Sequence, residues 1–452
     1  MELASLPVRH SRQPASWALA GFGIGAVVGA LVWMFLLGAA ERPDLSDRPA
    51  TATDRQAAGP LPRSIPALQA HLQTNPDDWR AWAALGLGYV DQARATGSPS
   101  LYPKADGAFE RSLSLRPDGN VGALAGRGAL ANARHDFAAG LKLADEAQAL
   151  DRSDPHAAAA RGDALVELGR YDDAFASFQH LVDLAPGLAS YTRAAYALEL
   201  QGDIPGATRT LQLALRDAFT PHDVAFANFS LGDLAWNHGD FSGARRYYTA
   251  AASADPDAVG PKAGLARLHA ASGAPGDAVA AWRDVVERAP LPEYVAELVN
   301  LYRVTGRRPE AQAQLELLGA QRALLTANGV NGDLELALFS ADHRVDLDQG
   351  LAAAQAEWTR RPSIHAADAL AWQLHAHGRP AEALPLADQA LRLGTSNALF
   401  YFHRGMIKHA LGETAGVRQD LSRALAINPH FSTIHAPAAA ETLAGLDTGA
   451  RR

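Results

Sequence analysis

The sequence has 452 residues, of which 48% are hydrophobic and 20% charged, a balance typical of folded proteins and not of disordered chains. Its formal net charge of −8 argues against a nucleic-acid partner, because a protein that neutralises phosphates needs a basic face. The absence of cysteine excludes disulfides, thiolate metal sites and cysteine nucleophiles.

The chain begins with a short tail, residues 1–16, followed by an apolar stretch without any charged side chain, residues 17–40. A helix of that length extends about 36 Å, which exceeds the roughly 30 Å of a bilayer's hydrocarbon core. The stretch therefore predicts a single transmembrane helix that anchors the chain to the cytoplasmic membrane. A cleavable signal peptide is the alternative, because the small residues Gly38, Ala39 and Ala40 could precede a cleavage site.

The orientation of this helix is not decided by charge, because arginines flank it on both sides. A short tail before one early apolar helix is typical of an uncleaved export signal, so we expect the bulk of the chain outside the cytoplasm. Gly21, Gly25 and Gly29 recur every four residues, a spacing that lets two membrane helices approach closely. This spacing predicts a homodimer, although glycine is also common in membrane helices that do not pair.

Residues 41–63 contain four prolines and mixed charges with no apolar period. This composition predicts a flexible linker with a reach of about 25 Å. The linker would separate the anchor from the remaining domain, residues 64–446, and residues 447–452 are expected to form a disordered tail.

From residue 64 onward the sequence repeats with a period of about 34 residues. The clearest unit, Pro155–Pro186, has a first helix that ends at Gly169 and a second helix that carries Phe178 and Leu181. Similar breaks occur down the chain and end at Phe137, Tyr171, Ile204, Phe241, Pro275, Arg308, Pro380 and Thr414. A further break without glycine falls around Val345–Leu347.

This pattern resembles the tetratricopeptide repeat. Trp82, Leu85, Gly86 and Tyr89 match the family's first-helix pattern, and residues 105–117 match its second-helix pattern with the late proline. The resemblance implies an all-α fold, a right-handed solenoid of ten helix–turn–helix units across residues 79–429 with a concave groove. Each pair leaves an apolar side uncovered, so neighbouring units must stack. Single cap helices are expected at residues 65–73 and 438–446, and a bend at residues 319–332.

The segment HAADALAWQLHAHGR, residues 365–379, becomes the first helix of the ninth unit. In the tetratricopeptide family one face of such helices lines the groove where peptides bind. Aromatic anchors with charged neighbours suit a peptide or a partner helix. The predicted partner-binding residues are Glu335, Phe339, Asp342, His365, Asp368, Trp372, His375, Phe402, Met406, His409, Phe229 and Trp236. The alternative is that these aromatic side chains pack against the adjacent superhelical turn.

A metal site on the same segment would use His365, Asp368 and His375 together with Asp342 or His343. The remaining ligands would have to come from other helices at unknown distances, so no metal and no other cofactor is predicted. Two further histidines, 377 and 403, fall off the groove face in the repeat frame and are interpreted as structural.

Neither a P-loop, an HExxH motif nor a GxSxG motif occurs, and the prediction is a protein that is not an enzyme. The leading hypothesis is a membrane-anchored interaction scaffold or assembly factor that binds a partner protein or peptide in its groove. Two alternatives stay open. One is a chaperone similar to those of cytochrome c maturation, and the other is a metal or small-ligand site on the C-terminal His/Asp/Trp cluster.

Overall fold

The computed structural model describes residues 61–62 and 64–449. The predicted tail, the predicted membrane helix with Gly21, Gly25 and Gly29, and nearly all of the linker lie outside the described residues. Across the described residues, no helix combines the length and the apolarity needed to span a bilayer.

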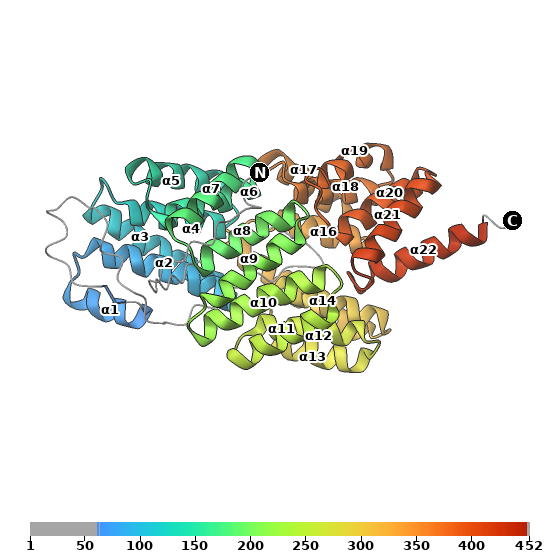
Figure 1. The fold of residues 1–452 in the computed structure, drawn as a ribbon, viewed down its shortest axis with the longest axis horizontal. Coiled ribbons are helices and arrows are strands. Elements are labelled where there is room, and N and C mark those ends of the chain that lie inside the picture. The colour runs from blue at the N-terminus through green and yellow to red at the C-terminus, as the bar shows by residue number, and fades with distance from the viewer. Residues whose placement is uncertain (1–60, 63, 450–452) are drawn as a thin grey trace.

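The described part of the chain is all-α, as predicted, with one short 3-10 helix (Pro99–Leu101) and no β-strand. Ten consecutive helix pairs, α2–α3 to α20–α21, stack side by side between two single helices, α1 and α22 (Figure 1). The helices are α1 (Ile65–Thr74), α2 (Trp79–Thr96), α3 (Tyr102–Leu115), α4 (Val121–Ala133), α5 (Phe137–Leu150), α6 (Pro155–Glu167), α7 (Tyr171–Leu184), α8 (Leu188–Leu200), α9 (Ile204–Arg216), α10 (Pro221–Asn237), α11 (Phe241–Ala254), α12 (Val259–Ala271), α13 (Pro275–Arg288), α14 (Pro292–Val304), α15 (Arg308–Ala327), α16 (Asp333–His343), α17 (Leu347–Arg360), α18 (Ile364–Ala376), α19 (Pro380–Ala390), α20 (Ala398–Ala410), α21 (Thr414–Ile427) and α22 (His435–Gly449).

The pair α6–α7 illustrates how a helix cap, a small residue at the helix contact and a turn glycine produce one helix pair. The Asp154 carboxylate accepts a hydrogen bond from the Ala157 amide (2.8 Å), which caps the start of α6. Gly162 leaves room for the Phe178 ring of α7, since a Cβ at this position would overlap that ring. Gly169 then takes a left-handed conformation (φ +74°) and turns the chain into α7.

Residues 319–332, predicted to form a bend, mostly belong to helix α15. The helix continues through most of this segment to Ala327, and only the last few residues turn, at Gly329 (φ +77°). The added length carries Leu325 and Val330 across to the apolar cluster formed by α2 and α3. The extra residues therefore connect the middle of the chain to its first helix pair.

The solenoid closes on itself along a line that we call the seam. Here four consecutive intra-pair turns, around residues 135, 169, 202 and 239, contact four consecutive loops that join later pairs, around residues 331, 362, 394 and 428. The hydrogen bonds across the seam join residues that lie 192–197 positions apart in the sequence. Figure 1 accordingly shows α6–α8 beside the α16–α18 region.

Backbone groups make much of the seam. The Asn331 amide donates to the Arg134 carbonyl (3.0 Å), and the Asn428 side-chain amide donates to the Trp236 carbonyl (2.7 Å). The Thr395 hydroxyl donates to the Leu200 carbonyl (2.5 Å). Each of these bonds ends on a carbonyl at the end of a helix, where intrahelical donors are in short supply.

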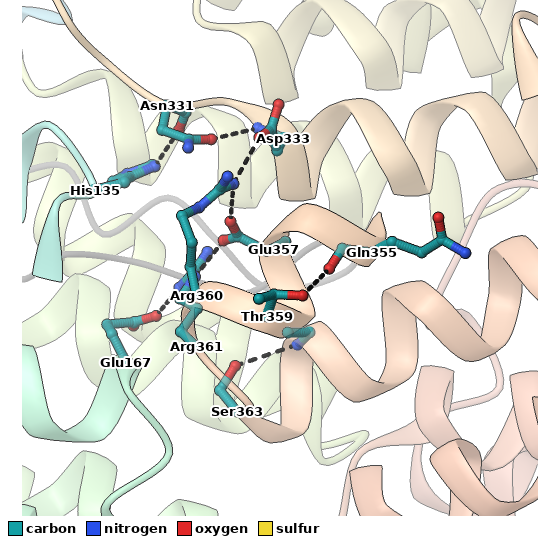
Figure 2. A network of polar contacts seen from close by, with 11 residues as sticks. His135, Glu167, Asn331, Asp333, Gln355, Glu357, Thr359, Arg360, Arg361 and Ser363 are labelled. Carbon is teal, nitrogen blue, oxygen red and sulfur yellow. Dashed lines mark hydrogen bonds and ion pairs between the residues drawn. The ribbon is translucent and has the colours of Figure 1, made fainter. Parts of the chain in front are cut away.

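A buried ion triad lies at the centre of the seam (Figure 2). The Arg361 guanidinium pairs with Glu167 at the end of α6 and with Glu357 on α17, and it also lies over the Phe137 ring (4.8 Å). The side chains of Arg361 and Glu167 are each only 2% exposed. Since buried charges require partners, the triad fixes how α6 and α17 meet.

Three glycines of the seam lie against the opposing backbone. A Cβ on Gly169, Gly202 or Gly239 would come within 2.6–2.7 Å of a carbonyl oxygen across the seam. The equivalent turn glycines Gly273 and Gly306 have the same positive φ but nothing within 4 Å. Local turn geometry therefore requires glycine at all these positions, whereas close packing requires it only at the seam.

We expect Gly239→Ala to destabilise the protein more than Gly273→Ala, its match in the next pair. A left-handed alanine costs about 1–2 kcal/mol at either position, and overpacking against the Ile427 carbonyl adds about 1–3 kcal/mol at the seam. Urea unfolding followed by circular dichroism would measure the difference. Equal losses of stability would contradict close packing at the seam.

We expect Glu167→Gln to lower the free energy of unfolding by about 2–4 kcal/mol, because it leaves the buried Arg361 charge with one carboxylate only. Asp173→Asn is the matched control, since it breaks an ion pair with Arg170 in which both side chains are 51% exposed. Such surface pairs contribute at most about 1 kcal/mol. Thermal and urea unfolding should show a clearly larger loss of stability for Glu167→Gln than for Asp173→Asn. Equal losses for the two variants would contradict a special contribution of the triad.

Candidate functional site

Closure of the solenoid leaves on its inner side a cavity of about 1190 Å³ that is partly open to solvent. Its wall combines α14, α15 and α16 with parts of α2, α10, α12 and α22. Helices from both ends and from the middle of the chain therefore share this one space. We call it the interior cavity.

Apolar side chains cover much of the cavity wall, including Leu291, Leu301 and Phe339. Val304 and Leu324 also line it and are 56% and 50% exposed, which makes them two of the few large apolar side chains that the described residues leave accessible. Accessible apolar surface beside a cavity is typical of a binding site for another molecule.

One wall of the cavity is acidic. Glu293 and Glu297 lie one turn apart on α14, and Glu335 and Asp342 lie two turns apart on α16, so each pair occupies one helical face. The opposing Arg267 guanidinium is already paired with Asp233 (3.1 Å). The arrangement therefore favours a cationic ligand next to α14 and α16.

The enclosed position of this wall changes the ionisation of its carboxyl groups. Glu293 is accessible from the cavity but surrounded by protein, and this loss of water, reinforced by the carboxylate of Glu335, raises the pKa of Glu293 to about 7. Burial also raises the pKa of Glu297. At Asp342 burial acts in the same direction, but His435, His403 and the Trp372 hydrogen bond outweigh it and lower the pKa of that carboxyl.

Several buried polar atoms of cavity-lining side chains make no hydrogen bond within the part of the chain that the structure describes. They are the Trp236 indole Nε1, the Tyr294 hydroxyl, Arg94 Nη1, Asn300 Oδ1, Gln321 Oε1 and Glu335 Oε2. Buried donors and acceptors are normally satisfied, by protein, by water or by a ligand. These atoms are themselves inaccessible to solvent, so a molecule in the cavity would reach them only after the wall rearranged.

The structure divides the residues predicted to bind a partner into two groups. Trp236, Glu335, Phe339 and Asp342 line the interior cavity. The other eight do not: Phe229, His365, Asp368, Trp372 and Phe402 are buried, His375 and Met406 are half-buried, and His409 is exposed. Partner binding by these residues stays a prediction, and the five buried ones match the packing alternative.

The reason for this burial is closure of the solenoid together with the C-terminal cap. His365 lies 3.5 Å from the Tyr196 hydroxyl of α8, which belongs to the adjacent superhelical turn. Phe402 packs against His435 at the start of α22, with ring centroids 4.7 Å apart. Residues that would line an open groove are therefore covered by other parts of the same chain.

A compact polar cluster surrounds Trp372. The Trp372 indole donates to Asp342 Oδ1 (2.8 Å), and its ring stacks on that of His403 (centroids 4.2 Å apart). His435 Nε2 lies 2.8 Å from the same Asp342 oxygen, and His403 Nδ1 lies 2.9 Å from the Asp368 carboxylate. The cluster joins α16, α18, α20 and α22.

Sequence reasoning missed two members of this cluster. His403 was interpreted as purely structural because it falls off the predicted groove face, and His435 lies beyond the last repeat. The five residues predicted as possible metal ligands are not brought together as a set. Asp342 instead meets His403 and His435, and their ligand atoms lie within 4.8 Å of one another.

Comparisons with known proteins match the helical pairs in the middle of the chain. Family models described as tetratricopeptide repeat match residues 124–189, 159–224, 192–259 and 235–300. Curated proteins give no match. Similar solved structures include the APC/C hetero-tetramer Cut9–Hcn1 (15% identity, 84% of this chain and 92% of that chain, TM-score 0.37). Another is a tetratricopeptide repeat protein from Parabacteroides merdae (13% identity, 53% and 97%, TM-score 0.40).

We expect Glu293→Gln to change how stability depends on pH. The folded-state pKa of about 7 lies above the ordinary value of 4.5, so this carboxyl favours folding most below pH 4.5 and loses that contribution as pH rises through 7. Urea unfolding at pH 5.5 and pH 8 should show that the wild-type chain loses stability relative to the variant. Glu382→Gln, on the exposed face of α19, should show no such difference. Parallel pH profiles for the wild type and Glu293→Gln would contradict the assignment.

Proposed function

This chain belongs to the tetratricopeptide repeat superfamily, and from that premise we propose that it is a protein–protein interaction scaffold that receives a segment of a partner protein in its interior cavity. The observation that carries the proposal is the composition of the cavity wall. Accessible apolar side chains and a row of carboxylates line one space. Its volume of about 1190 Å³ exceeds the roughly 300–1,000 Å³ typical of small-molecule sites, which favours a peptide.

The chemistry of the wall indicates what kind of segment would bind. Lysine or arginine side chains would pair with Glu293, Glu297 and Glu335, and apolar side chains would contact Val304 and Leu324. We therefore propose a basic segment with alternating apolar residues as the ligand.

We further propose that residues 17–40 hold this scaffold in the cytoplasmic membrane, with the solenoid on the outer side and residues 41–63 as a spacer. The support is the uncharged, apolar composition of the segment and its length. The glycine spacing at Gly21, Gly25 and Gly29 supports a dimer through the same helix. The proposed role is assembly or presentation of the partner, without catalysis.

A matched pair of peptides tests the binding proposal. A labelled peptide of leucine and lysine should bind at least about tenfold more tightly than its counterpart with glutamate in place of lysine, and added salt should weaken the binding. Leu324→Asp and Glu297→Gln should each weaken binding of the basic peptide. Fluorescence anisotropy measures the affinities, and circular dichroism checks that the variants keep their helix content.

Leu150→Asp is the control for the apolar substitution, because Leu150 is 52% exposed and does not line the cavity. A photo-crosslinker at position 324 should capture the partner in intact membranes, whereas one at position 150 should not. Equal affinity for the two peptides, or binding that is insensitive to Leu324→Asp, would contradict the proposal. Trp372→Ala is unsuitable as a probe, because this buried ring supports the core.

A further inference from the structure

We propose that Asp342, His403 and His435 form a binding site for a divalent transition metal ion of the Zn²⁺ class at the edge of the interior cavity. None of its three ligands is among the proposed peptide contacts, although one of these contacts, Glu335, shares α16 with Asp342. It would connect the cap helix α22 to α16 and α20.

The first argument is the convergence of donor atoms. Three ligand atoms, one each from Asp342, His403 and His435, lie within 4.8 Å of one another. They come from α16, α20 and α22, so no local turn places them together. Two imidazoles and one carboxylate are the donors that zinc accepts in three-residue sites, whereas magnesium and calcium prefer oxygen alone.

The second argument is an unused nitrogen on a buried imidazole. The His403 side chain is 0% exposed, and its Nδ1 lies 2.9 Å from Asp368. Its other nitrogen, Nε2, is buried and has no hydrogen-bond partner within the described residues. A histidine that donates Nδ1–H to a carboxylate presents a lone pair on Nε2, which is the atom that binds a metal.

The third argument is the support around these ligands. Asp368 orients His403, and the Trp372 indole donates to Asp342 Oδ1 (2.8 Å). Carboxylate–histidine–metal arrangements of this kind hold metal ligands in position in many sites. The charges also balance, because a divalent ion with neutral imidazoles would compensate the two carboxylates, Asp342 and Asp368, which are both nearly inaccessible to solvent.

The fourth argument is access. Asp342 lines the interior cavity, whereas His403 and His435 do not. An ion could therefore enter from the cavity side, and a fourth coordination position would remain for water or for a group of a bound molecule. Bound metal would tie the start of α22 to the cavity wall, so we expect it to stabilise the C-terminal part of the solenoid.

The test uses the full-length chain, purified without a histidine tag and freed of metal by a chelator. Titration with Zn²⁺ should show one tight site for each chain by calorimetry, and Co²⁺ should give the visible absorption of a low-coordinate site. Zn²⁺ should also raise the melting temperature. Asp342→Asn and His435→Gln should each abolish the tight site, and Asp368→Asn should weaken it about 10–100-fold by releasing His403.

His409→Ala is the matched control, since this exposed histidine lies on α20 less than two turns from His403. It should leave stoichiometry, affinity and the Co²⁺ spectrum unchanged. Circular dichroism of the metal-free variants separates loss of a ligand from loss of the fold. The proposal is overturned if the wild-type chain binds Zn²⁺ no more tightly than the Asp342→Asn/His435→Gln double variant, which would leave two ordinary Asp–His hydrogen-bonded pairs.

Discussion

The close approach of backbone to backbone at the seam is the constraint on which the rest of this structure depends. In an open solenoid each helix pair touches only its neighbours. Here Gly169, Gly202 and Gly239 bring three turns into direct contact with carbonyl groups about 190 residues further along the chain. The Arg361 triad then fixes the same approach electrostatically. Both features operate only when α4–α11 and α16–α21 stack as successive superhelical turns.

Closure also explains why the functional candidates lie inside. An open concave surface is hydrated, so its carboxyl groups keep ordinary pKa values and its aromatic side chains stay accessible. Protein packed around Glu293 and Glu297 lowers the hydration of their carboxylates, which raises the pKa of both groups. The cap helix α22 and the neighbouring C-terminal pairs bury Trp372 and Phe402 and place His435 beside Asp342. The cavity thus depends on closure of the solenoid, and the polar cluster depends on the C-terminal cap.

Features of the fold that depend on residues close together in the sequence could be predicted, whereas features that depend on residues far apart could not. The ten helix pairs and both cap helices could be predicted because caps, turn glycines and paired small and aromatic residues act within about 34 positions. The extension of α15 was missed, since its segment shows no strong period. The seam could not be predicted, because Arg361 at the end of α17 resembles any surface arginine. Likewise, His403 gains its partners only from helices that local spacing does not connect.

Ordinary solenoids gain or lose whole units with little penalty, since each unit carries its own complement of contacts. In this chain the contacts across the seam make the gain or loss of a helix pair costly. Removal of a single pair between α10 and α15 would slide every later loop past its opposing turn, so that Asn428 could no longer reach Trp236 and Thr395 could no longer reach Leu200. The contacts across the seam therefore fix how many helix pairs this solenoid can contain between α10 and α15.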